Sequence, residues 1–210
     1  MKSKFVVPCV APELELNGQI AIIGSSGKMK NVKHGQEIDR YDEVIRFNRA
    51  PCEGYEEYVG SKTTLRIVNN HVFNNNDIKH EGYTNQPANF VRDLRNSRIL
   101  YFASDLAPWA GKDTNTHSSN ELHLFDYRCA SVIKQQFGYP PDKFPTLGVG
   151  FICLCVMNGV VPSLFGFDTE NRRRDHYWED RPKESDYHGV NHEKELLKEL
   201  DKQGRVRIYG

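Results

Sequence analysis

Two short segments in the last quarter of the chain carry histidines beside carboxylates. One is Asp175-His176-Tyr177-Trp178-Glu179, and the other is His188-Gly189-Val190-Asn191-His192-Glu193. Imidazole titrates near neutral pH, so a histidine in such a setting is suited to hydrogen-bond a phosphate or to take a proton from a hydroxyl. Glu193 is placed to orient His188 as a general base. The spacing alone does not prefer His188 over His192.

Two further segments present backbone N–H groups where a ligand can reach them. GSSGK follows the apolar run Gln19–Ile23, but it is neither a P-loop nor a Rossmann glycine pattern, and a plain strand-to-helix turn explains it as well as a ligand loop does. The second is Pro145-Thr146-Leu147-Gly148 before an apolar stretch. Thr146 is predicted to cap a helix whose first N–H groups attract an anion; the alternative is a capped core helix without a ligand.

These segments lie between strands and helices that alternate along the chain. Such alternation predicts an α/β fold, a single domain with a mostly parallel central sheet flanked by helices. We place an N-terminal extension at 1–18 and the catalytic domain at 19–210. Strands are expected at 19–23, 43–47, 64–68, 98–103, 122–125, 163–167 and 206–209, and helices at 33–40, 88–96, 127–137, 148–159 and 192–203.

Composition excludes several classes of partner. The formal net charge of the 210 residues is zero, so no long-range field draws the chain to nucleic acid. No apolar run approaches the roughly 20 residues that span a bilayer. The apolar N-terminal stretch is short and is broken by Pro8 and Pro12, which predicts neither a signal peptide nor an anchor.

The five cysteines are odd in number and irregular in spacing, which predicts reduced thiols and a cytoplasmic protein without structural disulfides. Cys153 and Cys155 lie in an apolar run, where a separation of two residues suits buried free thiols better than chelation. The sequence also lacks an Asp-x-Asp pair, which argues against a nucleotide-sugar enzyme that holds its donor through a divalent metal. No metal or other cofactor is expected.

The four segments, in this order, resemble the motifs of the animal-type sialyltransferases, glycosyltransferase family 29. The family's long motif begins at the glycine turn, its short motif resembles Pro145–Gly148 with Phe165-Gly166-Phe167, and its last two motifs resemble His176–Glu179 and His188–Glu193. The positions that match the long motif are Gly24, Ser26, Gly27, Gly35, Ile38, Asp39, Asp42, Val44, Arg46, Asn48, Ala50, Pro51, Gly54, Glu56, Val59, Gly60, Lys62, Thr63 and Thr64.

The resemblance implies a variant GT-A-like, Rossmann-type fold and an inverting, metal-independent transfer of sialic acid from CMP-sialic acid to a glycan hydroxyl, with galactose or a similar hexose as the acceptor. It implies that His188 is the general base, that His176 stabilises the departing CMP phosphate, and that Glu193 supports the base. Implied donor contacts are Ser25, Ser26, Asn48, Thr146, Leu147, Gly148, Gly166 and Phe167.

The chain departs from the family pattern at several positions. Ile20 stands where the family has a cysteine, and the partner cysteine falls near Asn158 or Gly159, so the disulfide between the long and short motifs is absent. Ser25 and Phe144 replace an Asn and a Tyr, which leaves a CMP-Kdo-dependent transferase of a cell-wall or envelope glycan as an alternative. A catalytically degenerate CMP-sugar-binding protein is the other alternative, and the retained His176 and His188 speak against it.

Overall fold

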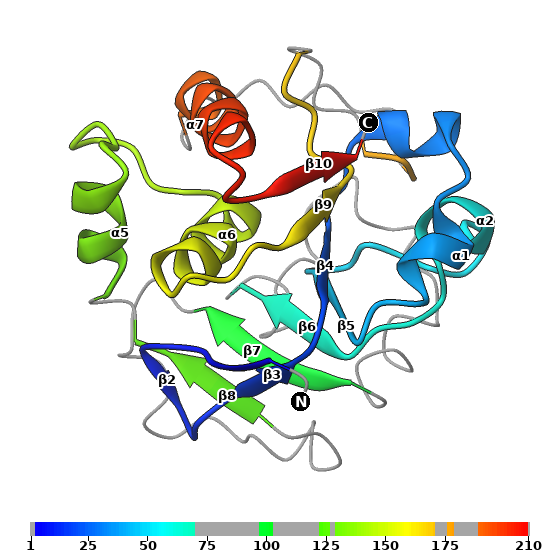
Figure 1. Cartoon of the computed structure of the whole chain (residues 1–210), viewed down its shortest axis with the longest axis horizontal. Helices are drawn as coiled ribbons and strands as arrows, with labels where there is room; N and C mark the ends of the chain where they lie inside the picture. The colour runs from blue at the N-terminus through cyan, green and yellow to red at the C-terminus, as the bar shows by residue number, and fades with distance from the viewer. Residues whose placement is uncertain are drawn as a thin grey trace, which may run out of the picture.

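The computed structural model describes residues 3–69, 97–102, 122–126, 129–170, 176–178 and 189–209. Figure 1 shows strands between two groups of helices. The strands are β1 (Lys4–Val6), β2 (Val10–Ala11), β3 (Glu15–Asn17), β4 (Ile20–Ile23), β5 (Glu43–Phe47), β6 (Leu65–Val68), β7 (Arg98–Phe102), β8 (Leu122–Phe125), β9 (Ser163–Phe165) and β10 (Arg207–Tyr209). The helices are η1 (Gly27–Asn31, 3₁₀), α1 (Gly35–Ile38), α2 (Glu56–Val59), α5 (Ala130–Gln136), α6 (Leu147–Met157) and α7 (Val190–Lys202).

Eight of the described strands form one sheet, in the order β10-β9-β4-β5-β6-β7-β8-β2. Each neighbouring pair is parallel except β2 with β8, and β1 pairs with β3 in a separate antiparallel ribbon. The predicted α/β fold with a mostly parallel sheet is therefore confirmed. β2, from the predicted extension, forms one edge of this sheet.

The alternation of side chains along β4 and β5 builds two apolar layers. Ile20, Ile22 and Ile45 face a core shared with α6 and α7, whereas Ala21 and Val44 face a second core shared with α1 and α2. Successive residues of a strand point to opposite faces, so a run that is apolar throughout is buried on both sides. Figure 1 shows α5, α6 and α7 on one side of the strands and α1 and α2 on the other.

At β4 the chain switches from one half of the sheet to the other. The chain continues from β4 to β5 on one side, and it returns after α6 to β9 on the other side. In open α/β sheets, ligands bind outside the carboxyl ends of the strands at such a switch point. The residues that follow β4, β5 and β9 are thus the ones that the fold brings to a binding crevice.

Most elements agree with the sequence-based expectations. β9 ends at Phe165, two residues early, because Gly166 turns the chain with a φ of 73°. The helix predicted over 127–137 is found as α5, and the helix predicted over 33–40 is shortened to α1. The helix predicted over 88–96 lies outside the described residues.

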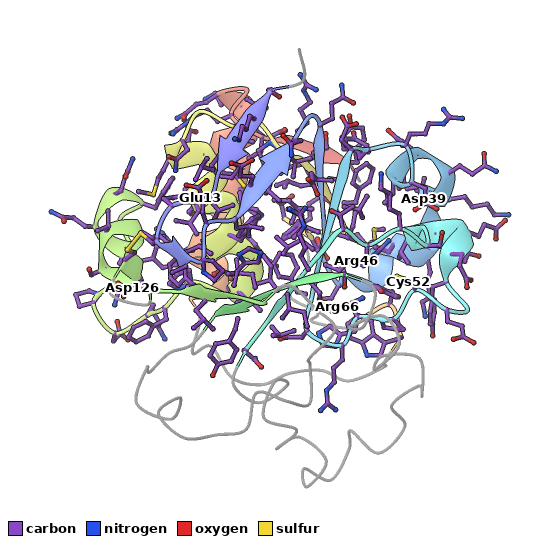
Figure 2. All side chains as sticks on the ribbon, turned by 90° about the horizontal axis from the view of Figure 1, so that it is seen from below. Glu13, Asp39, Arg46, Cys52, Arg66 and Asp126 are labelled. Atoms are coloured by element: carbon purple, nitrogen blue, oxygen red, sulfur yellow. A yellow bond between two sulfur atoms is a disulfide. The ribbon has the colours of Figure 1, made fainter. Side chains whose placement is uncertain are left out.

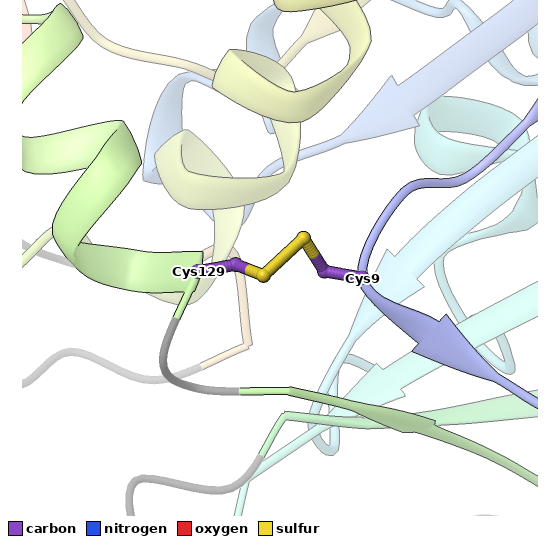
Figure 3. Close-up of a disulfide and its surroundings, with 2 residues drawn as sticks. All are labelled: Cys9 and Cys129. Atoms are coloured by element: carbon purple, nitrogen blue, oxygen red, sulfur yellow. A yellow bond between two sulfur atoms is a disulfide. The ribbon is translucent and has the colours of Figure 1, made fainter.

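The prediction for the cysteines is wrong at one pair. Cys9 and Cys129 form a disulfide, with Cα atoms 6.4 Å apart, between the segment before β2 and the start of α5 (Figure 3). Sequence reasoning missed it because 120 residues separate the two positions and only the fold makes them neighbours. A disulfide removes the argument for a reducing compartment, so the cytoplasmic location remains a prediction without that support.

Cys153 and Cys155, by contrast, are buried free thiols in α6, as predicted. Helix α6 is buried on nearly all sides, which explains why its sequence shows no polar face. Among the described residues, none of the helices has the length and apolar character of a membrane span.

Candidate functional site

The carboxyl ends of β4 and β9 meet through two glycines. The Gly24 N–H donates to the Phe165 carbonyl at 2.7 Å, and the Ser26 N–H donates to the Gly166 carbonyl at 3.1 Å. A Cβ atom on Gly24 would lie only 2.4 Å from the Gly166 oxygen, so no larger residue fits there without moving the backbone. The two loops are therefore in close contact, which brings Ser25 and Ser26 beside Gly166 and Phe167.

The start of α6 packs against the residues that follow β5 and β9. The Thr146 hydroxyl accepts a hydrogen bond from the Val149 N–H at 3.3 Å, so Thr146 caps the helix as predicted. A Cβ on Gly148 would lie 3.1 Å from the Phe167 ring and 3.7 Å from the Phe47 ring. The small residue thus lets the helix start pack between the strand exits of β9 and β5.

Asn48 occupies the exit of β5 in a left-handed conformation, with a φ of 45°. Its N–H donates to the Ile67 carbonyl at 2.8 Å, and its side-chain oxygen accepts from the Asn69 N–H at 3.1 Å. A positive φ is uncommon outside glycine, although Asn tolerates it better than most residues, and such conformations concentrate at functional sites. The fold therefore holds Asn48 firmly at the crevice.

His176 is brought to the same place from a distant part of the chain. It forms an antiparallel bridge with Ser26, and its ring stacks on Trp178 with centroids 4.4 Å apart and an interplanar angle of 14°. The structure thus gathers His176 with the predicted donor contacts at β4, β5, β9 and α6. His188 and Glu179 lie outside the described residues, so their placement stays a prediction.

A cavity of about 160 Å³ adjoins this crevice on the side of β10. It is lined by Ser26, Gly166 and Phe167 and by residues of η1, the segment between η1 and α1, β10 and the loop after β9: Lys28, Met29, Val32, His34, Asp168, Thr169, Glu170, Ile208 and Tyr209. Lys28 forms an ion pair with Asp168 at 3.2 Å. The crevice therefore has one partly charged flank.

Glu193 connects the starts of two helices. Its carboxylate is 5% exposed and accepts hydrogen bonds from the Thr146 N–H at 2.5 Å, the Thr146 hydroxyl at 3.0 Å and the Tyr139 hydroxyl at 3.3 Å. Sequence reasoning placed Glu193 beside His188; in the described part of the chain it bonds to the cap of α6. The Glu193 side chain therefore already accepts hydrogen bonds from the N–H and the hydroxyl at the start of α6.

This junction keeps nearby groups in their neutral forms. Burial, followed by the charge of Glu193, raises the pKa of Tyr139 far above its ordinary value of 10.0. Burial likewise raises the pKa of the Cys153 thiol, with Glu193 as the next cause. Neither group is ionised near neutral pH, so Tyr139 acts as a hydrogen-bond donor to Glu193.

Comparison with known proteins now identifies the family. The model of glycosyltransferase family 29 (sialyltransferase) matches residues 17–205, which include each of the strand exits described above. The chain belongs to this family. The recognition made from the motif order is thereby confirmed.

Two curated relatives of the family illustrate the extent of the match. Beta-galactoside alpha-2,6-sialyltransferase 2 of Rattus norvegicus is 31% identical over 132 residues, which are 63% of this chain and 22% of the relative. The protein of the same name in Danio rerio is 49% identical over 132 residues, 63% of this chain and 23% of the relative. The chain thus spans about a fifth of the length of these relatives.

A solved structure of the family supports the fold. A mammalian sialyltransferase in complex with Gal-beta-1-3GalNAc-ortho-nitrophenol superposes with a TM-score of 0.65 at 20% sequence identity, covering 91% of this chain and 68% of that chain. At this identity the likeness concerns the fold alone. The described site also contains Tyr139, which lies outside the motifs, and Tyr177, which lies within His176–Glu179 but was given no role of its own, because nothing in the local pattern reveals their distant partners.

Proposed function

We propose that this chain transfers sialic acid from CMP-sialic acid to a hydroxyl of an acceptor glycan. The observation that supports the proposal most is the gathering of the family's motif residues at one crevice. Ser26 and His176 form a bridge, and Gly148 packs against Phe167 at the exit of the neighbouring strand. The names of the curated relatives favour a β-galactoside as the acceptor and an α2,6 linkage as the product.

The proposed reaction is a single in-line displacement. The acceptor hydroxyl oxygen attacks the anomeric carbon of sialic acid, a new C–O bond forms, and the bond from that carbon to the phosphate oxygen of CMP breaks. His188 takes the hydroxyl proton, and the electron pair leaves with CMP. His176 and backbone N–H groups at the crevice stabilise the charge that develops on the phosphate. In this proposal the imidazole of His176 and the backbone N–H groups do the work that a divalent cation does in other transferases, so no metal is required.

Turnover with two donors tests the proposal directly. CMP release is measured with CMP-sialic acid or CMP-Kdo, with lactose as the β-galactoside, in the presence of EDTA. We expect acceptor-dependent release from CMP-sialic acid with full activity in EDTA. Release only from CMP-Kdo would favour the alternative transferase, and CMP binding without release from either donor would favour a binding protein.

Substitution of the two histidines separates their roles. His188→Ala is expected to lower kcat at least about 100-fold, since a general base typically contributes 10² to 10⁴ in rate. The affinity for CMP should stay within about twofold, because the base contacts the acceptor and not the nucleotide. His192→Ala is the matched control, since the His192 ring is bonded to the Phe137 carbonyl at 3.0 Å. Unchanged turnover in His188→Ala would remove His188 as the base.

A further inference from the structure

Tyr177, next to His176, is buried, whereas its neighbours His176 and Trp178 are half-buried. Its side chain is fully buried in the core beneath α1 and α2, and its ring packs edge-on against Tyr55 with centroids 5.1 Å apart. Its N–H donates to the Ser25 carbonyl at 3.0 Å, and its hydroxyl donates to the Pro51 carbonyl at 2.5 Å. Tyr177 therefore joins the segment that carries His176 to the loops after β4 and β5.

The hydroxyl of Tyr177 is held as a neutral donor. Burial raises the pKa of Tyr177 well above its ordinary value of 10.0, while the nearby guanidinium groups of Arg46 and Arg66 oppose the shift. Figure 2 shows Arg46, Cys52 and Arg66 near one another beside β5 and β6. A neutral donor to a buried carbonyl keeps its bond over the whole physiological pH range.

The Pro51 carbonyl, which accepts the bond from Tyr177, belongs to a loop in which several carbonyls are bonded to buried side chains. Arg66 donates from Nη1 to the carbonyls of Asn48 at 3.0 Å and Ala50 at 3.1 Å, and Tyr177 binds the next carbonyl, that of Pro51. Buried side-chain donors therefore set the path of the whole loop after β5. Because that loop begins with Asn48, one rigid unit holds both Asn48 and the anchor point of the His176 segment.

We propose that Tyr177 is a positioning residue for His176, acting through the hydrogen bond between its hydroxyl and the Pro51 carbonyl. This inference rests on the role proposed above for His176 at the donor phosphate. His176 has its backbone bridged to Ser26 and its ring stacked on Trp178. A shift of Tyr177 would move both the backbone bridge of His176 to Ser26 and the stack of its ring on Trp178. A small displacement of a group that stabilises a leaving group lowers the reaction rate more than it lowers the affinity for the substrate.

The first test measures the position of the His176 ring by NMR and does not depend on turnover. In Tyr177→Phe the ring and its packing remain and only the hydroxyl is lost. The ¹³Cε1–¹Hε1 resonance of His176 reports the ring current of Trp178, so we expect it to move toward the value of an unstacked histidine. Tyr55→Phe is the matched control, because it removes a hydroxyl from the same aromatic cluster, and among the described contacts that hydroxyl makes no hydrogen bond. An unchanged His176 resonance in Tyr177→Phe would overturn the proposal.

The second test reads catalysis as a double-mutant cycle. With CMP-sialic acid, Tyr177→Phe is expected to lower kcat about tenfold with the donor KM within about twofold, whereas Tyr55→Phe stays near the parent value. In the His176→Ala background, the further decrease in kcat caused by Tyr177→Phe should be less than about twofold, because the imidazole that Tyr177 positions is already absent. If the decrease in kcat of the double variant equals the product of the decreases in the two single variants, Tyr177 has a general structural role, and the proposal is overturned.

The two proposals fail in distinguishable ways. If His176→Ala leaves turnover unchanged, the role of His176 in the proposed function is wrong, while the resonance of His176 still decides whether Tyr177 sets its position. If His176→Ala lowers kcat but Tyr177→Phe behaves like Tyr55→Phe in both tests, only the inference about Tyr177 is wrong.

Discussion

The centre and the far edge of the large sheet are held together by different means. At the centre, hydrogen bonds hold the loop after β5 through the Tyr177 hydroxyl and Pro51, and they hold the start of α6 through Thr146 and Glu193. At the far edge, where β2 lies beside β8, the disulfide between Cys9 and Cys129 ties the N-terminal segment to α5. β6 and β7 separate the two regions.

In this fold, stability and site geometry depend on different kinds of interaction. A disulfide stabilises chiefly by restricting the unfolded chain, and it does so wherever the two cysteines lie. Buried hydrogen bonds contribute less each, but they fix the geometry of the groups that they join. Stability and site geometry are therefore expected to respond separately when each region is disturbed.

Removal of the disulfide should have the largest effect on stability and little effect on the site. Cys9→Ser/Cys129→Ser is expected to lower the free energy of unfolding by about 3 kcal/mol, because the disulfide closes a long loop of the unfolded chain. Urea unfolding measures the change, and CMP affinity should stay within about twofold. A thiol reductant should lower the midpoint of the parent but not of the double variant; an unchanged parent would contradict the disulfide.

Loss of the Glu193 carboxylate should disturb both stability and the site. Glu193→Ala leaves the Thr146 N–H and the Tyr139 hydroxyl without their acceptor, so we expect a loss of about 2 kcal/mol in urea unfolding. CMP affinity should fall as well, because the start of α6 is no longer held. The control is Glu195→Ala on the exposed face of the same helix, whose pair with Lys198 is worth under about 0.5 kcal/mol. Equal losses in both variants would contradict the role of Glu193.

Alkaline pH should weaken the centre of the sheet gradually, and the share of one group over one pH unit is the smallest of these effects. Burial raises the pKa of Cys153 and Cys155 above their ordinary value of 9.0 and that of Tyr139 and Tyr177 above 10.0. The folded chain then keeps protons that the unfolded chain loses. The stabilisation therefore declines above about pH 9 for the two thiols and above about pH 10 for the two phenols, by about 1.4 kcal/mol per pH unit for each group.

Urea unfolding at several pH values between 8 and 11 measures this slope. Cys155→Ala should reduce the slope above pH 9 by the share of one group, whereas Glu195→Ala, which removes neither a thiol nor a phenol, should leave it unchanged. A slope that is identical in the parent and in Cys155→Ala would show that the Cys155 thiol ionises as readily in the folded chain as in the unfolded chain.

Local patterns were sufficient to predict much of this fold. The strands at β4 and β5 were predictable because an apolar run that is bounded by polar turns is typical of a strand buried on both faces. The cap of α6 was predictable because Thr146 stands directly before the apolar helix. In each of these cases the residues that determine the structure are neighbours in sequence.

Contacts between distant segments could not be predicted in the same way. Cys9 and Cys129 are brought together by the edge pairing of β2 with β8, and Tyr177 meets Pro51 across 126 positions of the chain. Glu193 was expected near His188, yet its described partners are Thr146 and Tyr139, which only the packing of α7 beside α6 brings within reach. Side-chain partners of this kind depend on the three-dimensional arrangement and leave no periodic signal.

The position of β4 in the sheet also has a kinetic consequence. β4 is synthesised before β9, yet β9 is one of its two neighbours in the sheet. The register of this pair places Ile23 opposite Phe165. Contacts between residues so far apart in sequence form slowly, because a long loop must close first. The crevice can therefore assemble only after β9 has been synthesised and has docked, and until then the edge of β4 stays open to pairing with other chains. Rapid pairing of β9 with β4 would protect newly made chains from aggregation.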